Sequence, residues 1–218
     1  MTSFVLKIIA IISMFLDHLS YAIYGKFTYL NYIGRLAFPI FAFQITEGYL
    51  HTKNLKKYFL RLGIFAIISQ IPYYLFISTF STELTLNIFF TLFAGLLAIL
   101  AFDKFKNKFL GFLCVALIAA VSEYLHFDYG WFGILIIFIF YIFKNNEFNM
   151  SIAFITAVFL NYIIKLIQNN FYYAYYILAI CTMISIIPII LYNKKQGKSA
   201  KYFFYIFYPI HLILLYLL

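Results

Sequence analysis

Charged residues are scarce in this chain. They make up 11% of its 218 residues, whereas hydrophobic residues make up 66%. A soluble domain contains about 25% charged residues. Because the apolar excess extends along the whole chain, the composition excludes an ordinary soluble domain and predicts an integral membrane protein.

Cysteines and linker sequences are also few. Cys114 and Cys181 each stand alone in an apolar run, without a CxxC partner or a histidine at ligand spacing, so we predict no metal site. No Pro- or Gly-rich linker divides the chain, and residues 1–218 are predicted to form one domain. No A-x-A-like cleavage site follows the first apolar segment, so we expect a retained helix rather than a signal peptide.

Long apolar runs dominate what is present. A helix that crosses a bilayer needs about 20 predominantly apolar residues. The pattern predicts an all-α, polytopic transmembrane helical bundle, although the sixth and ninth runs are short. About nine spans are expected, at residues 4–24, 33–50, 57–78, 86–102, 109–125, 131–143, 149–165, 174–192 and 203–218.

The sixteen Lys and Arg residues lie mainly in the short connectors between these runs. With a cytoplasmic N-terminus, thirteen of them lie at the inner side and three at the outer side. Since basic residues favour the cytoplasmic side, we predict the N-terminus inside and the C-terminus outside. The net charge of +9 therefore reflects the basic connectors that orient the chain in the membrane. We predict that the protein contacts membrane lipid and does not bind nucleic acid.

Asp17 and His18 lie side by side within the first predicted span. A charged Asp at the centre of a bilayer helix costs roughly 2.5–3.5 kcal/mol on insertion scales. We expect Arg35 to compensate for Asp17 through a charge-assisted hydrogen bond. Neighbours on a helix point about 100° apart, so His18 needs its own partner, for which we predict Glu123 or Asp128.

Several polar side chains from different predicted spans fall at one depth. A helix rises about 1.5 Å per residue, which places His18, Gln70 and Asn161 in the outer half of the bilayer and His211 near mid-depth. Bundling would gather this layer around an outward-facing cavity. Taken alone, each of Gln70, Asn161 and His211 is more often a structural residue than a catalytic one.

A second polar cluster lies on the inner side, in "EGYLHTKNLKKYFLRL". The common interpretation of such a run is a topological anchor; the alternative is a phosphate-binding site, because Lys and Arg bind phosphates. Glu47 is unusual within an apolar run, and we expect it to pair with Arg61.

The segments "LKIIAIISMFLDHLSYAIYG", "GRLAFPIFAFQITEGYLHTKNLKKYFLRLGIFAIISQIPY", "LNIFFTLFAGLLA" and "KYFFYIFYPIHLILLYLL" resemble the TraX family of bacterial membrane proteins. The resemblance covers roughly residues 6–100 and 200–216. That family is linked to N-terminal acetylation of conjugative pilin. It is more distantly similar to multi-helix acyltransferases, which place a His in an early helix and end with a Y-x-x-H-like helix, as Tyr208 and His211 do here.

The resemblance implies an acetyltransferase of the bacterial cytoplasmic (inner) membrane, multi-pass, that moves an acetyl group from cytoplasmic acetyl-CoA to an amine or hydroxyl acceptor at the outer face. The acceptor would be a protein N-terminus or an envelope glycan. The expected catalytic positions are His18, Asp17, Arg35, Asn87 and His211, and the expected donor-binding positions are Lys53, Lys57, Arg61 and Glu47.

In this interpretation His18 acts as general base or carries the acetyl group itself. Asn87 or Arg35 would donate to the developing oxyanion. Two other classes stay open. A small-solute or proton-coupled transporter would also hold ionisable groups within the membrane, and an accessory protein of pilus or secretion machinery would use them only to join helices.

Overall fold

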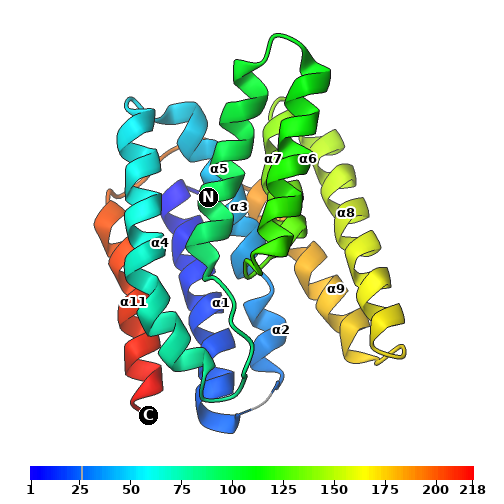
Figure 1. Ribbon diagram of the computed structural model, residues 1–218. Coiled ribbons are helices and arrows are strands. Elements are labelled where there is room, and N and C mark those ends of the chain that lie inside the picture. The colour runs from blue at the N-terminus through cyan, green and yellow to red at the C-terminus, as the bar shows by residue number, and fades with distance from the viewer. Residues whose placement is uncertain (26) are drawn as a thin grey trace.

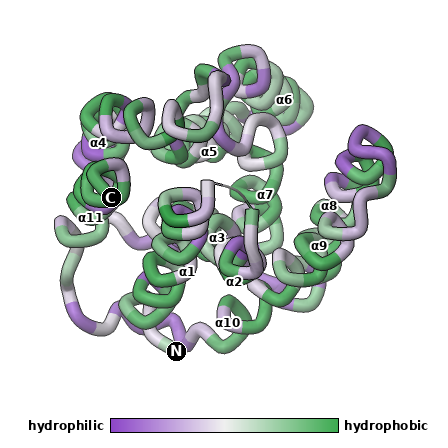
Figure 2. The backbone as a smooth tube through the Cα atoms, turned by 90° about the horizontal axis from the view of Figure 1, so that it is seen from below, coloured by the Kyte–Doolittle hydropathy of each residue, from purple (hydrophilic) through white to green (hydrophobic). Residues whose placement is uncertain are grey.

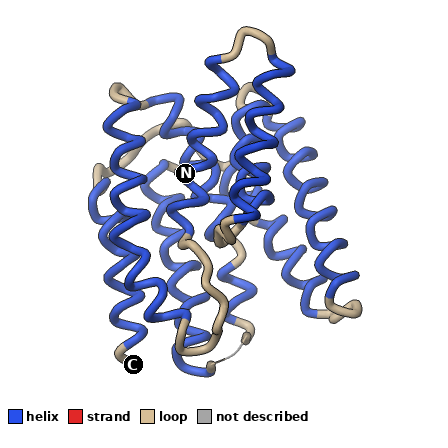
Figure 3. Tube along the Cα trace, in the orientation of Figure 1, coloured by secondary structure: helices blue, strands red, loops and turns tan. Residues whose placement is uncertain are grey.

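A computed structural model describes residues 1–25 and 27–218 and is helical throughout its secondary structure (Figures 1 and 3). Nine helices of eleven or more residues coincide with the nine predicted apolar segments, and two helices of five residues accompany them, which confirms the all-α class. The elements described are α1 (Ser3–Tyr24), α2 (Leu30–Gly34), α3 (Ala37–His51), α4 (Leu55–Ile77), α5 (Ile88–Lys104), α6 (Lys108–Tyr124), α7 (Gly130–Ile142), α8 (Glu147–Gln168), α9 (Ala174–Ile184), α10 (Ile186–Ile190) and α11 (Lys201–Tyr216).

Asparagine side chains define the starts of four long helices. Asn54, Asn87, Asn107 and Asn146 precede α4, α5, α6 and α8, and each accepts a hydrogen bond of 2.9–3.0 Å from a backbone N–H in the first turn. The first backbone N–H groups of a helix have no partner within it, and an Asn cap supplies one. Gly25 ends α1 in the left-handed region, with φ of 59°.

The second and eighth predicted spans are each interrupted. Helices α2 and α3 are separated at residues 35–36, and α9 and α10 at Ser185. Pro39 and Pro188 explain both breaks, because a proline has no N–H to donate to the carbonyl four residues earlier. Those carbonyls belong to Arg35 and Ile184, which lie at the interruptions.

Three helices, α1, α4 and α8, are long and apolar enough to cross a membrane. The full number of spans and their orientation stay predictions. The two Lys-rich connectors α3–α4 and α5–α6 lie at the upper end of the bundle in Figure 1, and the chain's C-terminus lies at the lower end. This arrangement agrees with the expected segregation of basic residues to one side.

The centre of the bundle is built around α1, α3, α5 and α7. Helix α3 packs against α1, α5 and α7, while α4 and α11 cover one side and α8 and α9 the other (Figure 2). Helix α7 has only 13 residues and is largely buried, with Ile134, Ile136 and Ile137 at 0% exposure. Gly95 on α5 permits this close contact, since an added Cβ would lie 3.1 Å from the Cβ of Ile137.

Two connectors meet at one end of this core. The backbone N–H of Leu86 donates to His126 at 2.9 Å, and that of Asp128 donates to Leu86 at 2.9 Å, forming an isolated parallel bridge. The bridge ties the start of α5 to the α6–α7 connector. It thereby places Asp128 beside α1 and α3 in the cavity described next.

Candidate functional site

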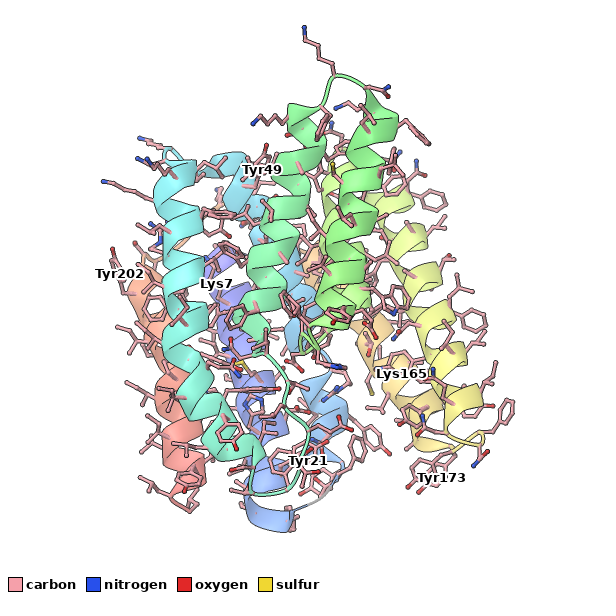
Figure 4. The ribbon with its side chains drawn as sticks, viewed as in Figure 1. Lys7, Tyr21, Tyr49, Lys165, Tyr173 and Tyr202 are labelled. Carbon is pink, nitrogen blue, oxygen red and sulfur yellow. The ribbon has the colours of Figure 1, made fainter. Side chains whose placement is uncertain are left out.

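A cavity of about 440 Å³ lies among α1, the α2–α3 junction, α4, α8 and the α6–α7 connector. We call it the histidine cavity. Its ionisable and amide side chains are contributed by segments far apart in the sequence, including Lys165 of α8 and Tyr21 of α1, which Figure 4 labels. They include Asp17, His18, Arg35, Glu123, Asp128, Asn161 and Lys165.

Asp17 and Arg35 form the ion pair that the sequence predicts. Arg35 Nη2 lies 2.5 Å from Asp17 Oδ1, and the two side chains are 23% and 16% exposed. Arg35 Nε also donates to the backbone carbonyl of Asn31 at 3.2 Å. Gly34 allows α2 to approach α1 here, because a Cβ at this position would collide with the side chain of Asp17.

Asn31 is a central residue of this network that sequence reasoning missed. Its Nδ2 donates to Asp17 Oδ1 at 3.0 Å, and its Oδ1 accepts from the Ser20 hydroxyl at 2.7 Å. The residue is 0% exposed. The available signal was its spacing four residues before Arg35, which places both on one helix face.

His18 and His211 form a hydrogen-bonded pair. His18 Nδ1 lies 2.8 Å from His211 Nε2, and the rings stack with an interplanar angle of 15°. The prediction that His18 pairs with Glu123 or Asp128 is therefore wrong. Helix rise alone places His211 at a different depth from His18, so the sequence did not predict that the two side chains meet.

The partner of His211 fixes the protons on this pair when both rings are neutral. His211 Nδ1 lies 2.9 Å from the carbonyl oxygen of Phe207, which can only accept, so Nδ1 carries the proton. His211 Nε2 is then an acceptor, and His18 Nδ1 must donate to it. His18 Nε2 is left unprotonated on a side chain that lines the cavity, as a general base requires.

Asp128 of the α6–α7 connector and Glu123 at the end of α6 also line the histidine cavity. Glu123 Oε2 accepts from the backbone N–H of Trp131 at 3.2 Å. The Asp128 side chain is exposed to the cavity, and partial desolvation by the protein atoms around it raises its pKa to about 6; Asp17 reinforces this shift, whereas Arg35 and Lys165 oppose it. Asp128 is thus a second group able to exchange a proton in the neutral range.

Asn161 also faces the histidine cavity, from α8. It is 5% exposed, and its Nδ2 has no hydrogen-bond partner among the described residues. Leaving a buried donor unpaired costs about 1–3 kcal/mol. A bound polar molecule would relieve this cost, which makes Asn161 a candidate ligand contact.

A second cavity, of about 350 Å³, lies among the first turns of α1, the second half of α3 and the starts of α4 and α11. We call it the basic-end cavity. It contains Lys7, Arg61 and Lys194 together with Glu47 and His51. Sequence reasoning had not assigned Lys7 or Lys194 to a site, because each resembles an ordinary topological charge.

Not all of the predicted donor-binding residues line this cavity. Arg61 and Glu47 do, whereas Lys53 and Lys57 are exposed in and beside the α3–α4 connector. Glu47 Oε2 lies 3.6 Å from His51 Nδ1, so His51 rather than Arg61 is its ionic neighbour.

Three buried atoms in the basic-end cavity have no hydrogen-bond partner among the described residues. They are Gln44 Nε2, Glu47 Oε2 and Arg61 Nε. Two of these atoms are donors and one is an acceptor. The set is therefore suited to a ligand that presents both an acceptor and a donor.

Four residues line both cavities: Met14, Phe41, Ile88 and Tyr208. They form a shared wall, of which Tyr208 supplies the only polar side chain. Tyr208 is 3% exposed, and its ring lies edge-on to His18 with centroids 6.4 Å apart. The wall thus brings a phenol hydroxyl and the histidine pair to the junction of the cavities.

Asn87, a predicted oxyanion donor, lies outside both cavity linings. Its Nδ2 donates to the Ala66 carbonyl and to Gln70 Oε1, each at 2.8 Å, and its Oδ1 caps α5. The structure does not bring Asn87 together with His18; its observed contacts join α4 to α5. Within the described residues, no group of three or more His, Cys, Asp or Glu side chains is placed to hold a metal ion.

Comparison with known proteins identifies the family of this chain. The family described as "TraX protein" matches residues 3–218. The chain belongs to the TraX family. The match includes both helices that carry the histidine pair of this TraX chain.

Two curated relatives resemble this TraX protein. A "Probable fimbrial assembly protein FimC, serogroup H1" of Dichelobacter nodosus is 39% identical over 112 residues, covering 45% of this chain and 46% of that protein. An uncharacterised protein of Rickettsia prowazekii (strain Madrid E) is 28% identical over 158 residues, covering 71% of this chain and 60% of its own length. The chain thus spans less than two thirds of either relative. No solved structure matches it.

Proposed function

We propose that this TraX protein is an acetyltransferase of the bacterial inner membrane that takes an acetyl group from acetyl-CoA on the cytoplasmic side. The acceptor is an amine or hydroxyl group at the outer face, on a protein N-terminus or an envelope glycan. The observation that carries the proposal is the hydrogen-bonded pair of His18 and His211. From the contact of His211 with the Phe207 carbonyl we infer that, when both rings are neutral, His18 Nε2 is free to accept a proton.

The reaction follows from that pattern. His18 Nε2 removes a proton from the acceptor N–H or O–H while the acceptor's lone pair attacks the thioester carbonyl carbon. A C–N or C–O bond forms, the C–S bond breaks, and the proton on His18 passes to the departing thiolate. While protonated, His18 donates through Nδ1 to His211, whose own N–H remains on the Phe207 carbonyl.

Tyr208 replaces Asn87 in our assignment of the oxyanion donor. Its hydroxyl belongs to the wall between the cavities, whereas the amide of Asn87 is occupied by Ala66 and Gln70. A donor that is held at the developing negative charge stabilises the transition state. The carboxylate of Asp17 keeps Arg35 in place and so maintains the geometry of α1 and α2.

Each cavity binds one of the two substrates. CoA phosphates carry charges that do not cross a bilayer, and the lining of the basic-end cavity includes His51 and Thr52, next to Lys53 in the α3–α4 connector. The acceptor enters the histidine cavity, where Asn161 and Lys165 provide polar contacts. In a two-step variant the acetyl group rests on His18 between the substrates.

A role in pilus-associated envelope assembly is part of the proposal. It is supported by membership of the TraX family and by the name of the Dichelobacter relative, a probable fimbrial assembly protein. A pilus subunit N-terminus is accordingly one acceptor to test.

The test is to incubate the purified protein with labelled acetyl-CoA and a cell-envelope fraction. We expect label to move into the envelope fraction, and His18→Ala to abolish that transfer while the protein still inserts and folds. His126→Asn is the matched control, because His126 is exposed in the α6–α7 connector and has the positive φ of 52° that Asn tolerates. Wild-type transfer by the His18 variant would refute the mechanism.

A small-solute or proton-coupled transporter is the second candidate, and one observation favours it. Two cavities approach the shared wall from opposite ends of α1, as alternating access would require. This reading predicts solute flux in proteoliposomes without CoA. An accessory role without catalysis predicts that joint replacement of His18 and Arg35 affects stability alone.

A further inference from the structure

The basic-end cavity has a polarity that a simple phosphate site would not have. Among the described residues, three of its buried atoms lack a hydrogen-bond partner: the donors Gln44 Nε2 and Arg61 Nε, and the acceptor Glu47 Oε2, which has only the ionic neighbour His51 at 3.6 Å. A phosphate would satisfy the donors but would bring its negative charge to the carboxylate of Glu47. A neutral secondary amide, with one C=O and one N–H, satisfies both kinds of atom.

The orientation of these groups is fixed by the fold. Gln44 and Glu47 are three residues apart on α3 and share a helix face with Gly48 and His51. The Ser3 hydroxyl donates to Gln44 Oε1 at 2.7 Å, which leaves Gln44 Nε2 as the unpartnered end of the amide. Gly48 keeps the face close to α4, since a Cβ there would lie 2.5 Å from the Tyr58 hydroxyl oxygen.

Size and lining favour a narrow, partly apolar chain in this cavity. Its volume of about 350 Å³ is at the lower end of the range of about 300–1,000 Å³ for small-molecule sites. Leu62, Leu92 and Phe89 form apolar parts of its wall. An extended arm of methylene and amide groups fits both the polar and the apolar parts of this lining.

Lysine side chains in and around the cavity can bind the phosphate groups of the same ligand. Lys53 and Lys57 are exposed around the α3–α4 connector, and Lys194 lies in the cavity lining contributed by the α10–α11 connector. Lys7 of α1, which Figure 4 labels, also lines this cavity. Phosphates bound outside would let the arm extend toward the shared wall and Tyr208.

We propose that Gln44, Glu47 and Arg61 bind the amide groups of the pantetheine arm of the donor, while its phosphates remain outside at Lys53 and Lys57. This deepens the proposed acetyltransferase function and rests on it. The arrangement selects donors by their neutral arm, and it gives Glu47 a specific role as the acceptor for an amide N–H.

Two fragments of CoA allow binding of the amide arm and binding of the phosphates to be measured separately. Pantetheine carries both amides and no phosphate, whereas adenosine 3′,5′-bisphosphate carries phosphates and no amide arm. Binding of each probe, and of CoA, is measured by calorimetry on the purified, detergent-solubilised protein. Glu47→Leu should raise the Kd of pantetheine about tenfold or more, because it removes the acceptor.

Three variants make the assignment specific. Glu47→Gln keeps an acceptor oxygen and should retain pantetheine binding within about threefold of wild type. Joint Lys53→Ala and Lys57→Ala replacement should weaken the bisphosphate and CoA but leave pantetheine unchanged. Glu83→Gln, in the exposed α4–α5 connector, is the matched carboxylate control and should change neither probe.

The outcomes distinguish failure of the amide-binding assignment from failure of the proposed acetyltransferase function. If CoA and the bisphosphate bind but pantetheine does not, or if Glu47→Leu leaves pantetheine binding unchanged, the amide assignment is overturned while acetyl transfer stands. If CoA and both probes fail to bind the folded wild-type protein, the acetyl-CoA function itself falls. Should Glu47→Leu fail to fold, the wild-type comparison of the two probes still decides between arm and phosphates.

Discussion

His18 Nδ1 on α1 and His211 Nε2 on α11 are 2.8 Å apart, although the two residues are separated by 193 positions in the sequence. His211 is itself held by the carbonyl of Phe207 at 2.9 Å. The pair therefore has the arrangement of a base and its orienting partner. His211 acts through His18 and is a positioning residue.

Replacement of His211 tests that role. His211→Phe keeps an aromatic ring to stack on Phe207, 4.8 Å away between centroids, but removes the acceptor for His18. We expect kcat for acetyl transfer to fall by about 10²-fold, within the usual range for general base catalysis, with KM little changed. The pH profile should also shift, which a purely structural role would not cause; an unchanged profile and rate would contradict the assignment.

Loss of one member of the Asp17–Arg35 pair should destabilise the protein. Arg35→Gln leaves the Asp17 carboxylate partly buried with Asn31 as its remaining partner. A hydrogen bond to a charged group contributes about 1.5–3 kcal/mol, and we expect a loss of that order in unfolding free energy. In denaturant titrations, joint Asp17→Asn and Arg35→Gln replacement should cost less than the sum of the single changes; simple additivity would show that the pair is not coupled.

Gly34 should be intolerant of even a methyl group. In Gly34→Ala the new Cβ would lie 2.5 Å from Asp17 Cβ, so α2 must move away from α1. We expect a lower melting temperature and reduced acetyl transfer. Gly63→Ala is the control, because its nearest contact is the flexible ring of Phe93 at 3.3 Å. Equal melting temperatures for the two variants would refute the close packing of α2 on α1.

Asp128 should make stability depend on pH. Its pKa is raised from 3.8 in the unfolded chain to about 6 in the folded protein, chiefly through partial desolvation by the protein atoms around the cavity that this exposed side chain faces. The folded state therefore binds this proton more tightly, and the contribution favours folding below pH 4 and is lost as the pH rises through 6. Melting temperatures of Asp128→Asn and wild type, measured from pH 4 to pH 7, should diverge, with wild type falling relative to the variant as the pH rises. Parallel curves would contradict the raised pKa.

Much of this architecture was predictable because the length of an apolar run is a local property of the sequence. The nine long helices coincide with apolar runs in the sequence, and the opposite charges of Asp17 and Arg35 predicted their pairing. The two helix interruptions were missed, although Pro39 and Pro188 mark the carbonyls that lose their partners.

The rest of the site depends on contacts that spacing does not encode. Charge complementarity suggested a carboxylate for His18, but the packing of α1 against α11 supplies His211. Likewise, Lys7 and Lys194 reach the basic-end cavity only because α1 and the α10–α11 connector meet. Asn87 has the polarity of an oxyanion donor, yet capping α5 and bonding Gln70 occupy it.

The most direct measurement is the rate of CoA thiol release from acetyl-CoA by the purified protein in the presence of an amine acceptor. We predict rapid release by wild type and by His126→Asn, and release by His18→Ala that is slower by at least about 10²-fold. Equal rates for wild type and folded His18→Ala, or no release by folded wild type with any acceptor from the cell envelope, would contradict the account.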